Sequence, residues 1–211
     1  MYEMIHEKEG IHKLYEGCYR DNLHSIWANQ ELYRKGNTKT EFYNILEKNM
    51  KILFINACVR KESRTLLLAN ELLSGLRGEI IEVFLPSLNL KPLDEKMIYD
   101  RMIDSDYQVY ARQFQEADTI VIAAPLWDLS FPSILKVYIE NICINGITFK
   151  YSENGPVGLC KAKRLLYVST SGGVNYPDFG FNYIKALSNM MFGIKDVIRF
   201  SAEGLDVWEN N

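Results

Sequence analysis

Three short segments of the sequence place hydroxyl, glycine or aromatic side chains directly after apolar runs. The first, CVRKESRT, ends on Ser63, Arg64 and Thr65 just before a run of leucines. Hydroxyls and unpaired amide N–H groups at a helix N-terminus favour a phosphate. Serine also caps helices without any ligand, so Ser63 alone fits either role. The segment lacks a glycine-rich cradle, which excludes a Walker loop and a dinucleotide fingerprint.

The other two segments could contact the flat part of a ligand. In APLWDLSFP, two prolines stiffen a segment that carries Trp127 and Phe131. These aromatics form a wall against a planar ligand in one interpretation and belong to the core in the other. In STSGGVNY, Gly172 and Gly173 stand beside hydroxyls and allow backbone N–H groups to approach a ligand edge, although an ordinary turn has the same composition.

Short apolar runs alternate with helical periodicity from Lys51 onward. This pattern predicts an α/β fold, a parallel sheet covered by helices on both faces. The predicted strands span residues 51–57, 79–85, 118–124, 164–170 and 197–202. Helices are predicted at 63–76 and 178–191. Two more are predicted between them, one with Tyr107, Tyr110, Ala111 and Phe114 on one face and one that begins at Pro132. Ligands of such sheets bind beyond the carboxyl ends of the strands, so the three segments share one edge.

Composition narrows the class of protein. The 211 residues are 47% hydrophobic and 24% charged, which suits one principal domain. Its 24 basic and 27 acidic residues are mixed along the chain, so no nucleic-acid partner is expected. The charged N-terminus and the lack of a long apolar stretch predict a cytoplasmic protein with no membrane span. The cysteines Cys18, Cys58, Cys143 and Cys160 form no C-x-x-C pair and are predicted to be free thiols.

From Met50 to about Asp206 the sequence resembles the FMN-dependent NADH azoreductase and quinone oxidoreductase family, within the wider flavodoxin-like group. The resemblance rests on AAPLWDLSFPSILKVYIE, GITFKYSENGPVGL and STSGG, in that order and spacing. It implies a flavodoxin-like doubly wound sheet of five parallel strands in the order 2-1-3-4-5. It also implies a homodimeric enzyme that passes hydride from NADH or NADPH through FMN to a small-molecule quinone or azo acceptor, in a two-electron ping-pong reaction.

The resemblance also assigns site residues. Ser63, Arg64 and Thr65 are expected at the FMN phosphate. Tyr151 and Trp127 are expected near the substrate. Two further loops are expected along the flavin, one at its isoalloxazine ring and one at its pyrimidine edge: Pro125, Leu126, Trp127, Asp128 and Leu129, then Thr170, Ser171, Gly172 and Gly173.

Two residues depart from the family pattern. Ala57 stands where the family often has a serine, and Asp128 stands where asparagine is common. A carboxylate facing the flavin would disfavour its anionic reduced form, whereas a contact made by backbone would be unaffected. All three histidines precede Met50, so no histidine acid or base is expected in the flavin domain.

Residues 1–49 are predicted to be a helical extension of the domain at 50–211. Helical stretches are expected at 5–15, 22–33 and 40–48, the last with Phe42, Ile45 and Leu46 on one face. Family members usually continue past the fifth strand into a final helix, so the stretch at 40–48 is predicted to cover the sheet in its place. A loosely ordered or partner-covering arm is the alternative. The irregular spacing of His6, His12, His24 and Cys18 predicts no metal site.

Two rival functions stay open at this point. The first is a flavodoxin-type electron carrier without direct NAD(P)H turnover, although the FKYSENGP segment and the aromatic loop suit a substrate pocket shared between subunits. The second is a regulatory or binding protein that has lost its flavin.

Overall fold

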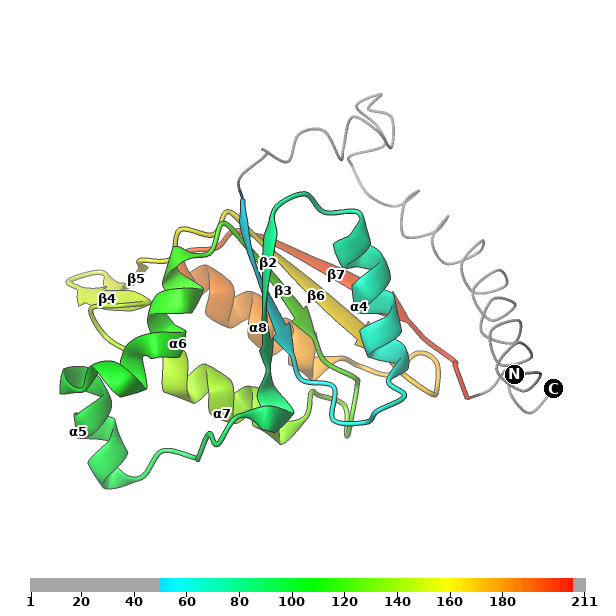
Figure 1. Cartoon of the computed structure of the whole chain (residues 1–211), viewed down its shortest axis with the longest axis horizontal. Helices are drawn as coiled ribbons and strands as arrows, with labels where there is room; N and C mark the ends of the chain where they lie inside the picture. Colours follow the sequence, from blue (N-terminus) through cyan, green and yellow to red (C-terminus); the bar gives the residue numbers. More distant parts are fainter. Residues whose placement is uncertain (1–49, 207–211) are drawn as a thin grey trace. The chain divides into compact units, whose positions relative to one another are not determined.

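The computed structural model describes residues 50–206, except the side chains of 105–107. Its centre is a sheet of five parallel strands (Figure 1). In spatial order the strands are β2 (Glu79–Phe84), β1 (Lys51–Asn56), β3 (Thr119–Ala123), β6 (Arg164–Thr170) and β7 (Asp196–Ala202). Counted among the parallel strands alone, this is the predicted order 2-1-3-4-5, so the flavodoxin-like fold is confirmed.

Helices cover both faces of the sheet. One face packs against α6 (Ser105–Glu116), α7 (Ser133–Ile142) and α8 (Phe179–Leu187), whose apolar side chains join Leu53, Ile55 and Ile122 in one core cluster. On the other face, α4 (Arg64–Ser74) packs Ala69 and Leu73 over a second cluster. The central strands are buried from both sides, and this explains why they read as nearly continuous apolar runs.

Capping residues define where the helices begin. The Ser63 hydroxyl accepts the Leu66 amide at 3.2 Å, and the Asp178 carboxylate accepts the Phe181 amide at 2.8 Å. Each cap satisfies one of the amides that a helix N-terminus leaves unpaired. Most predicted bounds agree with the structure to within a residue or two, but the last helix is shorter. It ends at Leu187 and continues as a wider π-turn over Ser188–Phe192.

Four elements were not predicted. After β2, the segment with Pro86 and Pro92 contains a 3₁₀ turn, Leu85–Ser87, and leads into α5 (Glu95–Ile103). Helix α5 has no buried residue, so no apolar stripe of core-facing residues marked it in the sequence. The segment FKYSENGP forms a hairpin of β4 (Phe149–Ser152) and β5 (Gly155–Gly158), closed by a turn in which Gly155 has φ +104°.

Several predictions fall outside the described residues. They are the helices at 5–15, 22–33 and 40–48, the packing of 40–48 on the sheet, and the positions of Cys18 and the three histidines. Within residues 50–206, no helix has both the length and the apolar character needed to cross a bilayer.

Candidate functional site

The three chemistry-bearing segments meet at the carboxyl edge of the sheet. Strands β1, β3 and β6 are neighbours and run in the same direction, so the loops that follow them leave from one edge (Figure 1). Thr170 joins the loops, because its hydroxyl lies 2.7 Å from the Thr65 hydroxyl and its carbonyl accepts the Leu126 amide at 3.0 Å. The sequence-based expectation that these segments lie together is confirmed by this geometry.

The loop after β1 offers backbone donors more readily than hydroxyls. Ser63 uses its hydroxyl as the α4 cap, and the buried Thr65 hydroxyl is paired with Thr170. The Leu66 amide is bonded to this cap, but a helix N-terminus leaves the amides before it without acceptors in the helix, and the helix dipole there favours an anion. Arg60 and Lys61 are exposed and add positive charge. The loop can therefore hold a phosphate, while direct contact by the two hydroxyls stays a prediction.

Arg64 links this loop to the end of the described chain. Its guanidinium donates to the Leu205 carbonyl at 2.9 Å and forms an ion pair with the Asp206 carboxylate. The predicted phosphate ligand thus has protein partners at the site edge. Its role toward FMN stays a prediction.

Cys58 is buried at the start of the same loop. Its amide donates to the Asn56 side chain at 3.0 Å, and Asn56 in turn donates to the Glu82 carboxylate at 2.8 Å. Burial raises the pKa of the Cys58 thiol, an effect that the Ser63 hydroxyl partly offsets. The thiol is therefore neutral at pH 7. Sequence reasoning missed this support because nothing in the chain pairs Asn56 with Glu82 before the sheet forms.

The loop after β3 contains a two-residue turn with a strained backbone. Trp127 and Ser130 exchange both of their backbone hydrogen bonds at 2.8 Å, and Asp128 and Leu129 between them have φ of 50° and 65°. Positive φ at both central positions defines a type I′ turn, which favours asparagine and glycine. Leucine in this conformation costs about 1–2 kcal/mol. Such strain persists where the surroundings enforce it, as at ligand-binding sites.

The two aromatics of this loop have different roles. Phe131 packs on the core and is 5.7 Å from the Tyr183 ring, so the core interpretation holds for it. Trp127 and Leu129 are each 40% exposed at the site edge. The side chain of Asp128 is also exposed and has no hydrogen bond or ion pair with any residue that the structure describes. The turn therefore offers an apolar wall with one carboxylate.

The loop after β6 presents free amide donors. The carbonyls of Ser171, Gly172 and Gly173 accept the amides of Leu205, Asp206 and Gly204 at 2.9–3.1 Å. By contrast, the amides of Gly172, Gly173 and Val174 donate to no residue between 50 and 206.

Both glycines in this loop lie against the ends of neighbouring side chains. A Cβ on Gly172 would lie 1.8 Å from the Asp206 carboxylate, and one on Gly173 would lie 2.1 Å from the Tyr176 ring. The free amides and the close backbone approach suit a planar ligand whose edge carries hydrogen-bond acceptors. The pyrimidine edge of FMN is such an edge, so the residues present fit FMN.

Tyr151 lies apart from the three loops of its own chain. It is 69% exposed on β4 and packs its ring at 5.3 Å against Phe149. The hairpin is followed by Lys161, whose amide donates to the Gln115 carbonyl near the start of β3. In Figure 1 the hairpin is at the left of the view, whereas the three loops are at the lower right. One chain alone does not bring Tyr151 to the site.

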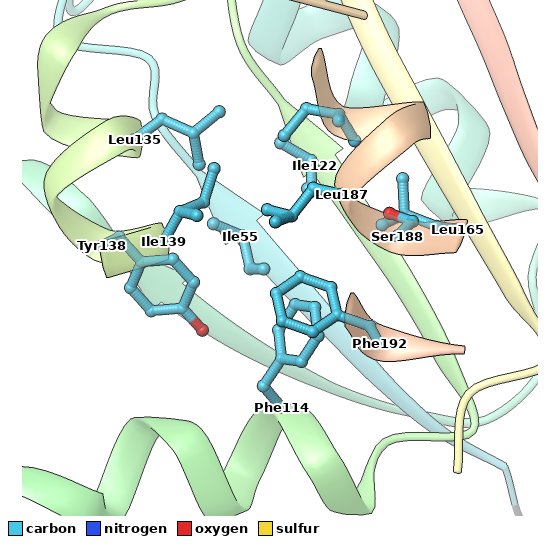
Figure 2. A pocket seen from close by; sticks show the side chains of 11 residues that line it. Ile55, Phe114, Ile122, Leu135, Tyr138, Ile139, Leu165, Leu187, Ser188 and Phe192 are labelled. Atoms are coloured by element: carbon cyan, nitrogen blue, oxygen red, sulfur yellow. The ribbon is translucent and has the colours of Figure 1, made fainter. Parts of the chain in front are cut away.

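A small apolar cavity lies inside the core, away from this edge. Figure 2 shows it between the sheet and the helices α7 and α8, closed on one side by Phe114 and Phe192. Tyr138 and Ser188 are among its lining residues, and the hydroxyl of neither has a hydrogen-bond partner in the described part of the chain. The cavity is a packing void of the core and not a cofactor site.

No metal centre accompanies the three loops. Residues 50–206 contain no histidine and no group of three or more metal-binding side chains.

Comparison with known proteins identifies the family. Residues 50–211 match the family model described as flavodoxin-like fold. The chain is 38% identical over 176 residues to "FMN-dependent NADH:quinone oxidoreductase 2" of Clostridium acetobutylicum, covering 74% of this chain and 88% of that relative. It is 36% identical over 176 residues, with the same coverage, to the "FMN-dependent NADH:quinone oxidoreductase" of Coprothermobacter proteolyticus.

Solved structures give the same fold. An FMN-dependent NADH-azoreductase of Bacillus anthracis str. Ames Ancestor, solved in complex with FMN, has a TM-score of 0.61 and 28% identity, over 75% of this chain and 89% of that one. The fold and the three-loop edge define a flavodoxin-like protein. Within that class, the chain belongs to the family of FMN-dependent NADH:quinone oxidoreductases and azoreductases.

Proposed function

We propose that this protein catalyses two-electron reduction of quinones or azo compounds by NADH or NADPH in a ping-pong reaction. Its family membership makes it an enzyme with FMN as cofactor and NADH as co-substrate. The observation that carries the proposal is the convergence of three cofactor-fitting loops on Thr170. When bound, FMN supplies the chemistry: it accepts a hydride from the nicotinamide and returns two electrons to the acceptor.

The residues of this chain bind and orient. The first turn of α4, with Arg60 and Lys61, supplies donors and positive charge for the phosphate. Ser63, Arg64 and Thr65 complete that end of the site in the proposal. Further contacts come from the five residues at 125–129, expected along the ring system, and from Thr170, Ser171, Gly172 and Gly173 at the pyrimidine edge.

An apolar rim beside these loops suits a planar acceptor. Trp127, Leu129, Tyr176 and Phe179 are large apolar side chains that are each at least 40% exposed. The Phe179 amide donates to the Leu129 carbonyl at 3.0 Å, which holds two of them together. Planar aromatic molecules gain from stacking on such surfaces and from leaving water. Quinones and azo compounds have this shape.

Tyr151 supports a homodimer in this proposal. Its side chain is 69% exposed and lies away from the loops of its own chain, so a second chain would have to bring it to a site. We also propose a cytoplasmic location. Cys58, Cys143 and Cys160 are free thiols, as expected in a reducing compartment.

The spectrum of the purified protein and its response to NADH test the function. We expect a flavin absorption spectrum that bleaches rapidly on anaerobic mixing with NADH and returns when a quinone is added. A flavin spectrum that NADH does not bleach would instead indicate an electron carrier. Protein without flavin, unable to take up added FMN, would indicate a binding protein and would contradict the proposal.

A further inference from the structure

A buried carboxylate lies beneath the loop that follows β6. Asp178 is 5% exposed, and its Oδ1 caps α8 through the Phe181 amide. Its Oδ2 forms an ion pair at 3.5 Å with Nε of Arg199, without a hydrogen bond between these two atoms, and no other described cation pairs with it. A buried charge costs several kcal/mol unless it is paired, so Asp178 depends on Arg199.

The Asp178 carboxylate lies near other buried polar groups. The buried hydroxyls of Tyr167 and Ser169 lie on the same strand, β6, and Tyr167 pairs in register with Arg199 on β7. Burial, followed by the charge of Asp178, raises the pKa of Tyr167. Tyr167 is therefore neutral, so Arg199 is the residue that compensates the charge of the Asp178 carboxylate.

Arg199 also contacts Glu203, which in turn binds the loop after β6. Its Nη2 donates to Oε1 of Glu203 at 3.1 Å. The other oxygen of Glu203 accepts the backbone amide of Asn175 at 3.1 Å. Asn175 has φ 60°, a left-handed conformation that is held more firmly when its amide is bonded to a carboxylate. The chain of contacts from Asp178 thus ends on the backbone of the loop at 171–176.

This loop is the one whose amides face no described acceptor. Its three carbonyls at Ser171, Gly172 and Gly173 bond to the segment just after Glu203. The Glu203 contact to Asn175 fixes the loop one residue beyond Val174, the last of the unpaired amides. The position of the donors therefore depends on both ends of the loop, and one end depends on Glu203.

We propose that Asp178, Arg199 and Glu203 act as positioning residues that hold the amides of Gly172, Gly173 and Val174 in place for FMN. The inference rests on the proposed function, because it requires that FMN binds at this edge. None of the three residues needs to touch the cofactor. They act through the backbone of the loop, so the affinity for FMN reports their effect.

Two variants of Glu203 separate positioning from charge. In Glu203→Gln the side-chain oxygen can still accept the Asn175 amide, whereas Glu203→Ala removes that acceptor. A hydrogen bond from an amide to a carboxylate contributes enough that we expect Glu203→Ala to raise the Kd for FMN about tenfold or more. Glu203→Gln should stay within about threefold of the unmodified protein, because its amide oxygen replaces the acceptor.

A matched control is provided by the other end of the same two strands. Arg164 on β6 pairs with Asp196 on β7 at 2.6 Å, and its side chain is 29% exposed, against 27% for Arg199. Arg164→Gln removes the cross-strand ion pair with Asp196, whereas Arg199→Gln removes the ion pairs with the α8 cap Asp178 and with Glu203 just after β7, so each variant removes a paired arginine of similar exposure. We expect weaker FMN binding only for Arg199→Gln, even if both variants lower the melting temperature.

Fluorescence titration of the flavin-free full chain with FMN, together with thermal melting of each variant, provides the test. The proposal is supported if Glu203→Ala and Arg199→Gln weaken binding while Glu203→Gln and Arg164→Gln do not. It is overturned if Glu203→Ala binds FMN as tightly as the unmodified chain, or if affinity follows melting temperature in all four variants. Failure of the unmodified chain to bind FMN would overturn the proposed function itself.

Discussion

The carboxyl edge of the sheet and the core beneath α6, α7 and α8 differ in side-chain burial and in backbone strain. The core consists of apolar side chains in unstrained helices and strands, and Phe114, Leu135 and Ile142 are almost fully buried in it. The edge has a turn with two positive φ angles, exposed aromatics and amides without described acceptors. Stability thus resides in the core, while the edge keeps unfavourable features that a bound cofactor would satisfy.

The largest expected effect comes from the core. Phe114 is 1% exposed and packs its ring 4.7 Å from that of Phe192, beside the cavity of Figure 2. Phe114→Ala removes this packing and enlarges an existing void, and it should lower the free energy of unfolding by about 3–5 kcal/mol. Urea denaturation monitored by circular dichroism measures the change.

An edge residue of similar size provides the control. Trp127 is 40% exposed, so Trp127→Ala should cost less than about 1 kcal/mol of stability, while it raises KM for a planar acceptor. The comparison fails if Trp127→Ala destabilises the protein as much as Phe114→Ala does.

The second largest expected effect is a loss of stability at alkaline pH. Burial raises the pKa of Cys143 from 9.0 to about 11, and burial followed by the nearby Cys143 raises that of Cys160 from 9.0 to about 12. Between these values the folded chain binds more protons than the unfolded chain, so stability is intact below pH 9 and falls as pH rises toward 12. Each thiol accounts for a loss on the order of 2 kcal/mol by pH 11.

Denaturation curves from pH 8 to pH 11 measure this loss. Lysines and tyrosines titrate in the same range, so the informative comparison is with the double variant Cys143→Ala, Cys160→Ala. Its stability should depend less steeply on pH than that of the unmodified chain. Equal slopes for the two proteins would show that the buried thiols do not contribute.

How far the sequence predicted the structure depends on whether a signal was local. Apolar runs and N-caps are local, so the five parallel strands and the starts of α4, α7 and α8 could be predicted directly, and with them the shared edge of the three loops. The Asp178, Arg199 and Glu203 contacts could not, since they depend on the pairing of β6 with β7. Helix α5 was missed because its apolar side chains, such as Ile103, face outward.

The strained turn at the edge allows a smaller but opposite effect. Leu129→Gly places a residue without a Cβ where φ is 65°, which should raise the free energy of unfolding by about 1 kcal/mol or leave it nearly unchanged after the entropic cost of glycine. The same change loosens the turn and should weaken FMN binding. Thermal melting and FMN titration are the two measurements. Tighter FMN binding by this variant would contradict a role for the strained turn.

The smallest expected effect concerns the buried tyrosines. Tyr138 is fully buried, and its hydroxyl has no partner among residues 50–206, although its ring packs edge-on against Tyr110 at 6.3 Å. Tyr138→Phe removes an unpaired polar group while keeping the ring, and it should be neutral or stabilise the fold by up to about 1 kcal/mol.

Tyr167→Phe tests whether the location of a buried hydroxyl matters. Tyr167 is equally buried, and its hydroxyl also has no hydrogen-bond partner among residues 50–206, but it lies near the charged Asp178–Arg199 pair, which favours a polar group over a hydrocarbon. This variant should therefore lose a few tenths to about 1 kcal/mol, the reverse of the change at Tyr138. Two chemically identical substitutions with opposite signs, compared by urea denaturation, would show that the Asp178–Arg199 pair stabilises the Tyr167 hydroxyl although both tyrosines belong to one core cluster. Equal effects would show that the ion pair does not act on Tyr167.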